Sequence, residues 1–376
     1  YRREIVSGYD RTGTTAQLHR TFLNRKTVSP SMKLKEFQSH LRKEGIDRVF
    51  LVHPDVNIIY FTQQKSSFAL LQITPSSASL YLTRLDKLPT LKDISSSVLQ
   101  KGWDKKLADP KATKIGVNKS SLSLLYAEKL RKMYPGAELV DISSALNRLR
   151  AQKTPQEIKK ITAACAITSR AFNELVDKFS AQRFKTEKDI AFFLDKYISG
   201  SGADPAFPAI VASGKNSATP HHITSSAKLS KGFLQLDFGA CWKNYCSDMS
   251  RILYLGKPAA SEKEHFELLL GVQAASIKKI ALCRPFSALE DFSRKKLGKY
   301  SSFFIHSLGH GVGVEIHEQP SFSPGAENTI KSNQVFTIEP GIYFRGKYGL
   351  RIEDTLLFQG RAKILTTAPK GLIRLK

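Results

Sequence analysis

Four carboxylates stand in stretches of sequence that otherwise read as buried strands. They are Asp237 in LQLDFGA, Asp248 in YCSDMSRILYL, Glu339 in VFTIEPG and Glu353 in LRIEDTLL. Burying one carboxylate without a partner costs several kcal/mol, and the obvious basic neighbours in the sequence are only Arg251 and Arg351. A salt bridge or an edge strand would explain any one of the four. Together they require a fold that compensates them at one place, and a metal cluster supplies that compensation.

The spacing of these carboxylates predicts two strand pairs. Asp237 and Asp248 are eleven residues apart, which suits two adjacent antiparallel strands. Glu339 and Glu353 are fourteen residues apart, and PGIYFRGKYG forms a suitable loop between their strands. Each pair therefore brings its two carboxylates from neighbouring strands.

Histidines gather in the same half of the chain. Of the nine histidines, five lie in two short stretches, His221 and His222 in PHHIT, and His306, His310 and His317 in IHSLGHGVGVEIHEQP. The glycines around His310 allow the backbone to approach another group closely. A lone histidine is usually a core or surface residue, but three within twelve positions of a glycine-rich stretch indicate a site.

Four carboxylates and one histidine make an oxygen-rich ligand set. Such a set favours Mn, Co or Fe, or Zn in a bridged pair, over a structural zinc site with thiolate ligands. Four negative charges are too many for one divalent ion but suit two. Two metal ions about 3.5–4 Å apart share a bridging hydroxide and polarise a carbonyl, so the ligand set predicts hydrolytic chemistry.

The N-terminal part of the chain divides into an extension and a first domain. Residues 1–31 hold six basic and two acidic residues and no apolar periodicity, which is typical of a flexible or non-native extension, of sequence upstream of a start at Met32, or of an organelle transit segment. Residues 32–150 predict a smaller α/β domain. We expect helices in MKLKEFQSHLRKEGI and around 88–100 and 120–134, and strands in RVFLVH, NIIYFT, FALLQIT, ASLYLT, KIGVN and AELVDI.

The second domain, residues 151–376, predicts an α+β fold. Thr154, Pro155 and Glu157 form a capping signal for a helix that runs to about Phe179, and a second signal at 186–189 opens a helix to about residue 198. Further helices are expected at 261–282 and in SALEDFSRKKLGKY. The expected strands are AIVAS, FLQLDFGA, CSDMSRILYL, VFTIEPGIYF and LRIEDTLLF.

Composition excludes several other classes of protein. The 376 residues are 41% hydrophobic, and no run of eighteen apolar residues occurs, so we expect no transmembrane helix. The net charge of +25 is spread evenly, +13 over residues 1–150 and +12 over the rest, with no dense basic tract, so no specific nucleic-acid partner is expected. Four cysteines without a C-x-x-C pair predict reduced thiols and a cytoplasmic location.

Five short signatures together resemble the pita-bread metallopeptidases. They are IVASGKNSATPHH, SDMSR, HSLGHGVGVEIHE, TIEPGIY and RIEDT. Residues 34–145 are in turn similar to the N-terminal domain of the Xaa-Pro branch, which contains Xaa-Pro aminopeptidase and prolidase (Xaa-Pro dipeptidase). The resemblance implies an α+β pita-bread (creatinase/aminopeptidase) catalytic domain preceded by a smaller creatinase-like α/β domain, and often a homodimer.

The resemblance also implies residue roles. Two divalent ions, with Mn the first choice and Co, Zn or Fe as alternatives, would be held by Asp237, Asp248, His310, Glu339 and Glu353. A metal-bridging hydroxide would attack the peptide bond before proline, with Glu339 assisting proton transfer. Catalytic contacts to substrate would come from His221 and His317, and His306 would line the pocket. Behind the ligands, Arg351 would orient the bridging carboxylates, and Ser250 replaces the usual threonine of D-x-T-R.

One departure bears on specificity. Many Xaa-Pro members have arginine directly after H-E-x-P, where this chain has Ser321. If that arginine holds the C-terminal carboxylate of a dipeptide, its absence favours an Xaa-Pro aminopeptidase, acting on short peptides with proline second, over an Xaa-Pro dipeptidase. Arg345 and Lys347 are alternative cations. Methionine aminopeptidase fits less well because it usually lacks such a first domain, and a non-catalytic binding protein fits less well because no ligand is lost.

Overall fold

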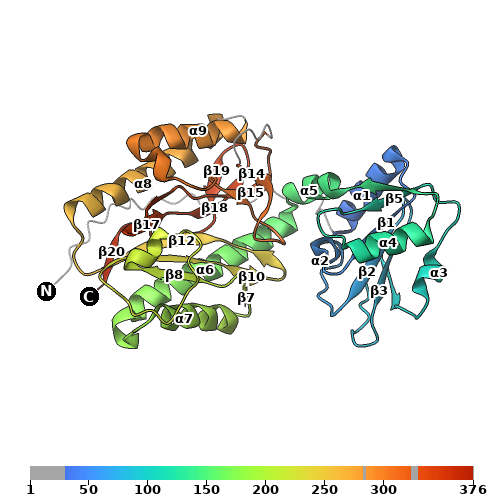
Figure 1. Ribbon diagram of the computed structural model, residues 1–376, viewed down its shortest axis with the longest axis horizontal. Helices are drawn as coiled ribbons and strands as arrows, with labels where there is room; N and C mark the ends of the chain where they lie inside the picture. The colour runs from blue at the N-terminus through green and yellow to red at the C-terminus, as the bar shows by residue number, and fades with distance from the viewer. Residues whose placement is uncertain (1–29, 283–284, 323–328, 376) are drawn as a thin grey trace, which may run out of the picture.

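The computed structural model describes residues 30–282, 285–322 and 329–375. Nearly all of the predicted extension 1–31, and Cys283, therefore lie outside the described residues. The N-terminal and C-terminal parts of the chain lie side by side and are connected where α5 is followed by α6 (Figure 1).

The first part is built on one mixed sheet of six strands in the order β4-β3-β2-β1-β5-β6. Helix α1 presents Leu34, Phe37 and Leu41, which are all buried as their spacing predicted. The elements are α1 (Pro30–Glu44), β1 (Arg48–Val52), α2 (Val56–Thr62), β2 (Ala69–Ile73), β3 (Ala78–Leu82), β4 (Ser95–Val98), α3 (Trp103–Leu107), β5 (Lys114–Val117), α4 (Leu124–Met133), β6 (Glu138–Asp141) and α5 (Ser143–Ala151).

Two expectations for this part are wrong. The NIIYFT run is helix α2 rather than a strand, because the Asp55 side chain accepts a hydrogen bond from the Asn57 backbone N–H and caps a helix there. A short apolar run carries no periodicity that separates the two structures. The window 88–100 contains no helix, and Ser95–Val98 instead adds to the sheet edge as β4, parallel to β3.

The second part opens with the two helices that the capping signals predicted. Thr154 and Glu157 form a reciprocal capping box at the start of α6, and Thr186 and Asp189 form one at α7. The helical elements are α6 (Pro155–Gln182), α7 (Glu187–Gly200), η1 (Gly214–Ala218), α8 (Ala260–Lys279), η2 (Ile280–Leu282), α9 (Phe286–Leu297) and η3 (Gly298–Phe303). The third and fourth expected helices are thus confirmed as α8 and α9.

Two antiparallel-rich sheets form the centre of this part. Their orders are β20-β12-β9-β8 and β14-β13-β15-β18-β19, and two small sheets, β16-β17 and β11-β10-β7, flank them. The strands are β7 (Asp204–Pro205), β8 (Ile210–Ser213), β9 (Gly232–Phe238), β10 (Ala240–Trp242), β11 (Tyr245–Cys246), β12 (Met249–Leu255), β13 (His310–Gly311), β14 (Glu318–Ser321), β15 (Gln334–Ile338), β16 (Gly341–Phe344), β17 (Tyr348–Arg351), β18 (Asp354–Phe358), β19 (Ala362–Ile364) and β20 (Ile373–Leu375).

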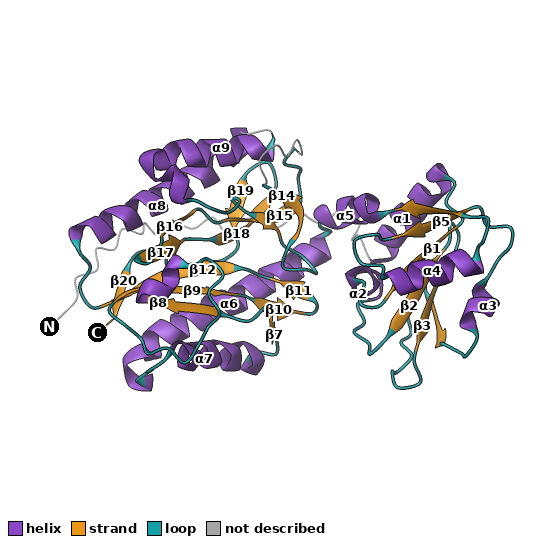
Figure 2. Cartoon of the chain, in the orientation of Figure 1, coloured by secondary structure: helices purple, strands orange, loops and turns teal. Residues whose placement is uncertain are grey.

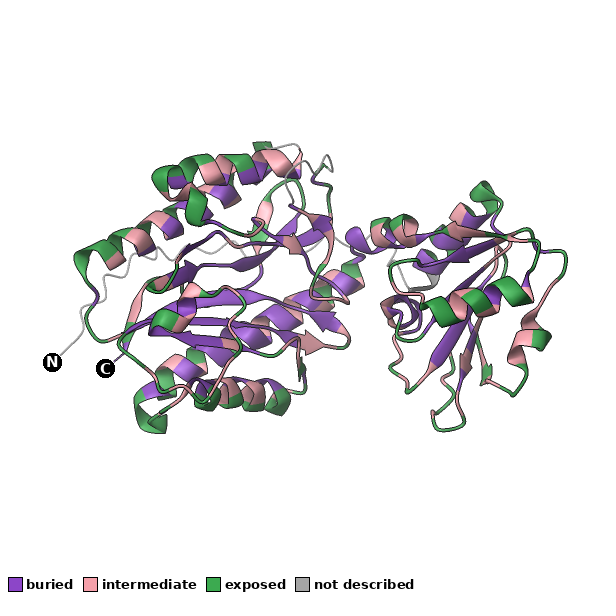
Figure 3. Cartoon of the chain, viewed as in Figure 1, coloured by how far each residue is buried: buried purple, intermediate pink, exposed green. Residues whose placement is uncertain are grey.

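Helix pairs cover the strands from two sides. Helices α6 and α7 lie on one side and α8 and α9 on the other (Figure 2). One apolar cluster packs residues of α8 and α9 against β12, β15 and β18, and another packs α6 and α7 against β8, β9 and β20. Figure 3 shows the strands buried and the outward faces of the helices exposed. Polar groups on the central strands β9, β15 and β18 are therefore shielded from water.

The strands are interrupted where the carboxylates stand. Asp237 lies inside β9, as expected, but Asp248 precedes β12, Glu339 follows β15, and Glu353 lies between β17 and β18. The expectation that all four sit within continuous strands is wrong for these three. Breaking a strand frees a side chain from the alternation of faces, so each carboxylate turns toward a common point.

A buried charged cluster joins the two parts of the chain. Lys153, between α5 and α6, forms an ion pair with Glu318 of β14 at 2.5 Å, and each side chain is only 1% exposed. Arg150 of α5 pairs with Glu315 at 2.6 Å and approaches Glu318 at 3.8 Å. The linker is thereby attached to the loop that runs between His310 and β14.

We expect Lys153→Met to lower the free energy of unfolding by about 3 kcal/mol, because it leaves the buried Glu318 carboxylate short of a cation. Urea denaturation measures this change. Lys178→Met is the matched control, because Lys178 pairs with Glu174 on an exposed helix face and such a pair contributes well under about 1 kcal/mol. Equal losses of unfolding free energy for the two variants would show that the buried pair contributes no more stability than the exposed one.

Candidate metal centre

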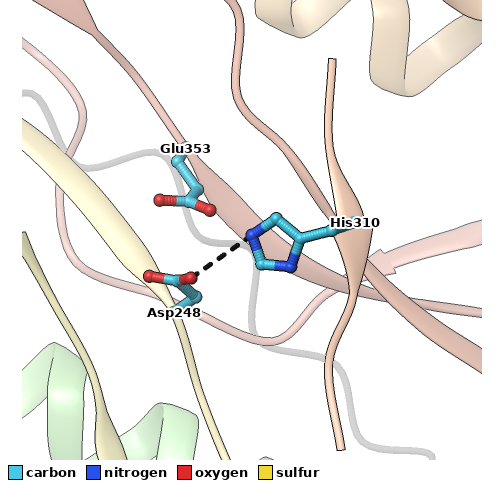
Figure 4. Close-up of side chains that lie close together, drawn as sticks. All are labelled: Asp248, His310 and Glu353. Atoms are coloured by element: carbon cyan, nitrogen blue, oxygen red, sulfur yellow. Dashed lines mark ion pairs between the residues drawn. The ribbon is translucent and has the colours of Figure 1, made fainter. Parts of the chain in front are cut away.

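Three side chains from separate strand ends converge on one point. Asp248, His310 and Glu353 each offer a ligand atom, and these atoms lie within 4.8 Å of one another (Figure 4). Asp248 comes from the start of β12, His310 from β13 and Glu353 from the break before β18. The sheet containing β12 and the sheet containing β13 and β18 therefore meet at this point.

The other two predicted ligands border the same group. Glu339 Oε1 lies 3.3 Å from His310 Nε2, and Asp248 Oδ2 lies 3.5 Å from the same nitrogen. Asp237 sits opposite Ser250 in the β9–β12 register, two residues along from Asp248. The structure thus brings together all five residues that the resemblance named.

Unpartnered oxygens at the centre fit a metal ion. Asp237 Oδ1, Asp248 Oδ1 and Glu353 Oε1 are buried and have no hydrogen-bond partner among the described residues. Buried carboxylate oxygens normally have a donor or a cation, because their desolvation is otherwise uncompensated. The donor set of carboxylates and one imidazole suits a divalent ion that prefers oxygen.

The surroundings of His310 favour a neutral imidazole with an unprotonated Nε2. Its Nδ1 lies 3.1 Å from the Gly311 carbonyl oxygen, which can only accept, so Nδ1 carries the proton and the Nε2 lone pair faces the carboxylates. Burial lowers the pKa of His310 to about 4. The imidazole is therefore uncharged at neutral pH and free to bind a metal.

The carboxylates show the opposite shift. Burial raises the pKa of Asp248 and of Glu353 well above the usual range, and the neighbouring carboxylates raise both further. Burial also raises the pKa of Glu339. Without a metal ion the folded state therefore retains protons on these groups that the unfolded chain has lost at the same pH.

This shift predicts a pH-dependent response to metal. Because the folded-state pKa values are raised, the metal-free protein loses stability as the pH rises above about 4, the ordinary carboxyl value, and a metal ion removes that loss. We expect Mn²⁺ to raise the melting temperature more at pH 8 than at pH 5. Asp248→Asn should abolish most of the rise, whereas Glu174→Gln on the surface should leave it intact. A Mn²⁺ effect that is the same at both pH values would contradict the proposed ligand set.

Arg351 lies behind the centre and donates hydrogen bonds toward two of its carboxylates. Its Nη2 donates to Asp237 Oδ2, and its Nε donates at 2.9 Å to Ser250 Oγ, which donates in turn to Glu353 Oε2 at 2.9 Å. Arg351 thus contacts Asp237 directly and reaches Glu353 through the Ser250 hydroxyl. Its role in orienting the bridging carboxylates Asp248 and Glu353 stays a prediction.

Two further supporting residues were not identified from the sequence. Thr337 Oγ1 donates to Glu339 Oε1 at 3.1 Å and accepts from the His310 backbone N–H at 3.1 Å. The Tyr343 hydroxyl accepts from Arg351 Nη1 at 2.7 Å and lies 3.1 Å from His306 Nε2. Both could have been identified from the sequence, because they are polar residues in the apolar stretch around Glu339.

The remaining histidines line one side of the centre. The rings of His317 and His310 are 4.2 Å apart, edge to face, and His306 is fixed by Tyr343 and by the Ser307 carbonyl. Burial lowers the pKa of both His306 and His317, and the nearby His221 lowers both slightly further.

The glycines around His310 have the expected purpose. A Cβ on Gly309 would lie 2.1 Å from the Thr337 carbonyl oxygen, and one on Gly311 would lie 2.3 Å from the Gln319 carbonyl oxygen. The backbone that presents His310 therefore lies directly against β15 on one side and β14 on the other, and no larger residue fits.

We expect Gly309→Ala to destabilise the protein by about 3 kcal/mol and to weaken metal binding, because backbone atoms must move to admit the methyl group. Thermal unfolding with and without Mn²⁺ measures both effects. The control is Gly271→Ala in α8, where a Cβ meets nothing within 4 Å, and a gain of about 1 kcal/mol is expected. A tolerated alanine at 309 would show that the close approach is not required.

Comparison with known proteins defines the class first. Residues 159–359 match metallopeptidase family M24, and residues 33–152 match the creatinase/prolidase N-terminal domain. The chain belongs to metallopeptidase family M24, with the pita-bread catalytic fold and the creatinase-like first domain that its sequence predicted. It is thus a metallopeptidase, whose chemistry uses divalent metal ions. Among the described residues, no helix is both long and apolar enough to cross a membrane.

Particular relatives match nearly the whole chain. The Xaa-Pro dipeptidase of Pyrococcus furiosus is 31% identical over 348 residues, which is 91% of this chain and 99% of the relative. The Xaa-Pro dipeptidase of Pyrococcus horikoshii is 32% identical over 353 residues, covering 91% and 98%.

Solved structures agree with the sequence matches. The prolidase of Pyrococcus horikoshii OT3 has a TM-score of 0.81 at 29% identity, covering 91% of this chain and 99% of that one. The X-Pro aminopeptidase of Thermotoga maritima has a TM-score of 0.77 at 30% identity, covering 89% and 100%.

Proposed function

We propose that this metallopeptidase hydrolyses the peptide bond before proline and that its principal substrates are Xaa-Pro dipeptides. The observation that carries the proposal is the convergence of Asp248, His310 and Glu353 in a chain that two Xaa-Pro dipeptidases match almost end to end. The sequence alone favoured an Xaa-Pro aminopeptidase. The full-length relatives give more support to the alternative, the dipeptidase.

Five residues would hold two divalent ions, with Mn the first choice. They are Asp237, Asp248, His310, Glu339 and Glu353. Four carboxylate charges balance two dications but overcompensate one. Bound divalent ions supply a Lewis acid for the peptide carbonyl and lower the pKa of water.

The chain's own residues do the remaining work. Glu339, buried beside His310, accepts and returns the proton of the attacking water. His221 and His317 donate hydrogen bonds to the carbonyl oxygen as negative charge develops there. His306, held by Tyr343, forms a fixed wall of the pocket. Burial lowers the pKa of both His306 and His317, which favours neutral rings that do not repel the metal ions.

The second candidate, an Xaa-Pro aminopeptidase, is favoured by one observation. Ser321, at the position where many relatives have arginine, pairs with His310 in the register of β13 and β14. A cation at that position would lie beside the metal ligands, where it could bind the terminal carboxylate of a dipeptide. Its absence allows a longer peptide to continue past the proline.

Hydrolysis of Ala-Pro and Ala-Pro-Ala by the Mn²⁺-loaded protein separates the two candidates. A dipeptidase cleaves Ala-Pro with the higher kcat/KM, and an aminopeptidase prefers Ala-Pro-Ala. In either case Glu339→Ala should lower kcat by roughly 10³-fold, because general acid–base assistance contributes on that order. Wild-type turnover in metal-loaded Glu339→Ala would refute the mechanism. Ser321→Arg should shift the preference toward the dipeptide if the missing cation decides peptide length.

We also propose that the chain divides near residue 150 into the two domains expected from the sequence. In support, the six-stranded sheet is complete before α5 ends at Ala151, and the two family matches stop and start on either side of residues 153–158. The homodimer, the cytoplasmic location and the absence of a nucleic-acid partner stay predictions.

A further inference from the structure

Among the buried carboxylates outside the metal centre, Glu187 serves no role in the mechanism described so far. Glu187 is the first residue of α7, and its side chain is fully buried. Its neighbour in the chain, Thr186, caps the helix together with Asp189, so the Glu187 side chain is not needed for that capping box. The Glu187 carboxylate makes its hydrogen bonds with a different part of the chain.

The Glu187 carboxylate accepts five hydrogen bonds from a single segment, residues 213–225. Oε1 accepts from the Ser213 backbone N–H at 2.9 Å and from Asn216 Nδ2 at 2.8 Å. Oε2 accepts from His222 Nε2 at 2.8 Å and from the Ser225 backbone N–H and hydroxyl at 3.3 and 3.1 Å. One side chain thus holds both ends and the middle of the segment.

The same segment is seated against the active centre. The Ser217 hydroxyl accepts from the Gly349 backbone N–H at 3.0 Å, and the Pro220 carbonyl accepts from Arg351 Nη1 at 3.3 Å. A Cβ on Gly349 would lie 2.2 Å from the Ser217 carbonyl oxygen, so the two backbone segments are too close together to admit a side chain at position 349. The segment also carries His221, next to the His222 that Glu187 binds.

The charge of Glu187 is maintained by these donors. Burial alone would raise the pKa of Glu187, but the hydrogen bonds from Asn216, Ser213 and His222 outweigh it and lower the pKa. The N-terminal end of α7 also favours a negative charge at this position. An ionised acceptor makes stronger hydrogen bonds than a neutral amide, so the anchor depends on the carboxylate itself.

We infer that Glu187 is a positioning residue of the active site. It holds segment 213–225 in place and thereby fixes His221 for substrate binding, together with the Pro220 carbonyl that accepts from Arg351. The inference rests on the proposed function for its catalytic consequence. Its physical content, that one carboxylate anchors the segment, stands apart from any activity.

Hydrogen–deuterium exchange on the full-length protein tests the anchor. Glu187→Gln keeps the size of the side chain but replaces one acceptor oxygen with an NH₂ group. We expect peptides within 213–225 to exchange at least about tenfold faster in this variant. The matched control is Asp189→Asn, which weakens the capping box of the same helix without touching the segment. It should speed exchange only at the start of α7, and unchanged protection of 213–225 in Glu187→Gln would overturn the inference.

Kinetics test the positioning role. With Mn²⁺ content equal to wild type, Glu187→Gln should lower kcat/KM for the better of the two proline peptides by about 10–100-fold, since misplacement of a substrate contact costs that much. Asp189→Asn should stay within about twofold. An opened segment with unchanged kcat/KM would overturn the positioning role.

Two outcomes keep this test separate from the proposed function. A wild-type protein without peptidase activity would defeat the proposed function, and the anchor would then stand or fall on the exchange rates alone. If Glu187→Gln does not fold, Asn216→Ala removes a single donor from Oε1 and should give a smaller increase in exchange confined to 213–225. No increase in that variant would count against the anchor.

Discussion

The need to neutralise buried negative charge organises this molecule. Four carboxylates from neighbouring strands and strand breaks meet at a largely buried point, and three of their oxygens have no donor among the described residues. The neighbouring side chains compensate this concentration of negative charge. Arg351 pairs with Asp237, Ser250 shares its hydroxyl between Arg351 and Glu353, and His310 presents a bare nitrogen. Divalent metal ions bound here would complete the neutralisation, and the same charge that destabilises the metal-free fold would then provide its chemistry.

A ring of neutral and charged supports surrounds the ligands and sets their directions. Thr337 fixes both Glu339 and the His310 backbone, while Tyr343 links Arg351 to His306. Further out, Glu187 holds the segment that carries His221. Each of these side chains stands on a strand or helix or at its end, which limits its movement. The reactive groups are therefore held by rigid strands although they stand at strand breaks.

Structural features that depend on residues near one another in the chain could be predicted from the sequence, and features that depend on distant residues could not. Capping boxes at Thr154 and Thr186 act within one helical turn, so both helix starts were predicted correctly. The four carboxylates could be singled out because buried carboxylates are rare, and the resemblance added His310 to them; their role as metal ligands stays a prediction. The NIIYFT run was assigned wrongly because its helix depends on the Asp55 side chain rather than on periodicity. The breaks beside Asp248 and Glu353, and the anchoring of a distant segment by Glu187, arise from tertiary packing and leave no regular pattern along the chain.

The buried pair of Lys153 and Glu318 bears on how separable the two parts of this chain are. The lysine lies just outside the region that matches the creatinase/prolidase N-terminal domain, and the glutamate lies deep in the metallopeptidase region. A catalytic unit excised after residue 153 would retain a glutamate whose counter-ion had been removed. Exchange of the first part between relatives would likewise have to preserve the short linker. The joint therefore belongs to both parts, because its buried ion pair takes one residue from the linker and one from the metallopeptidase region.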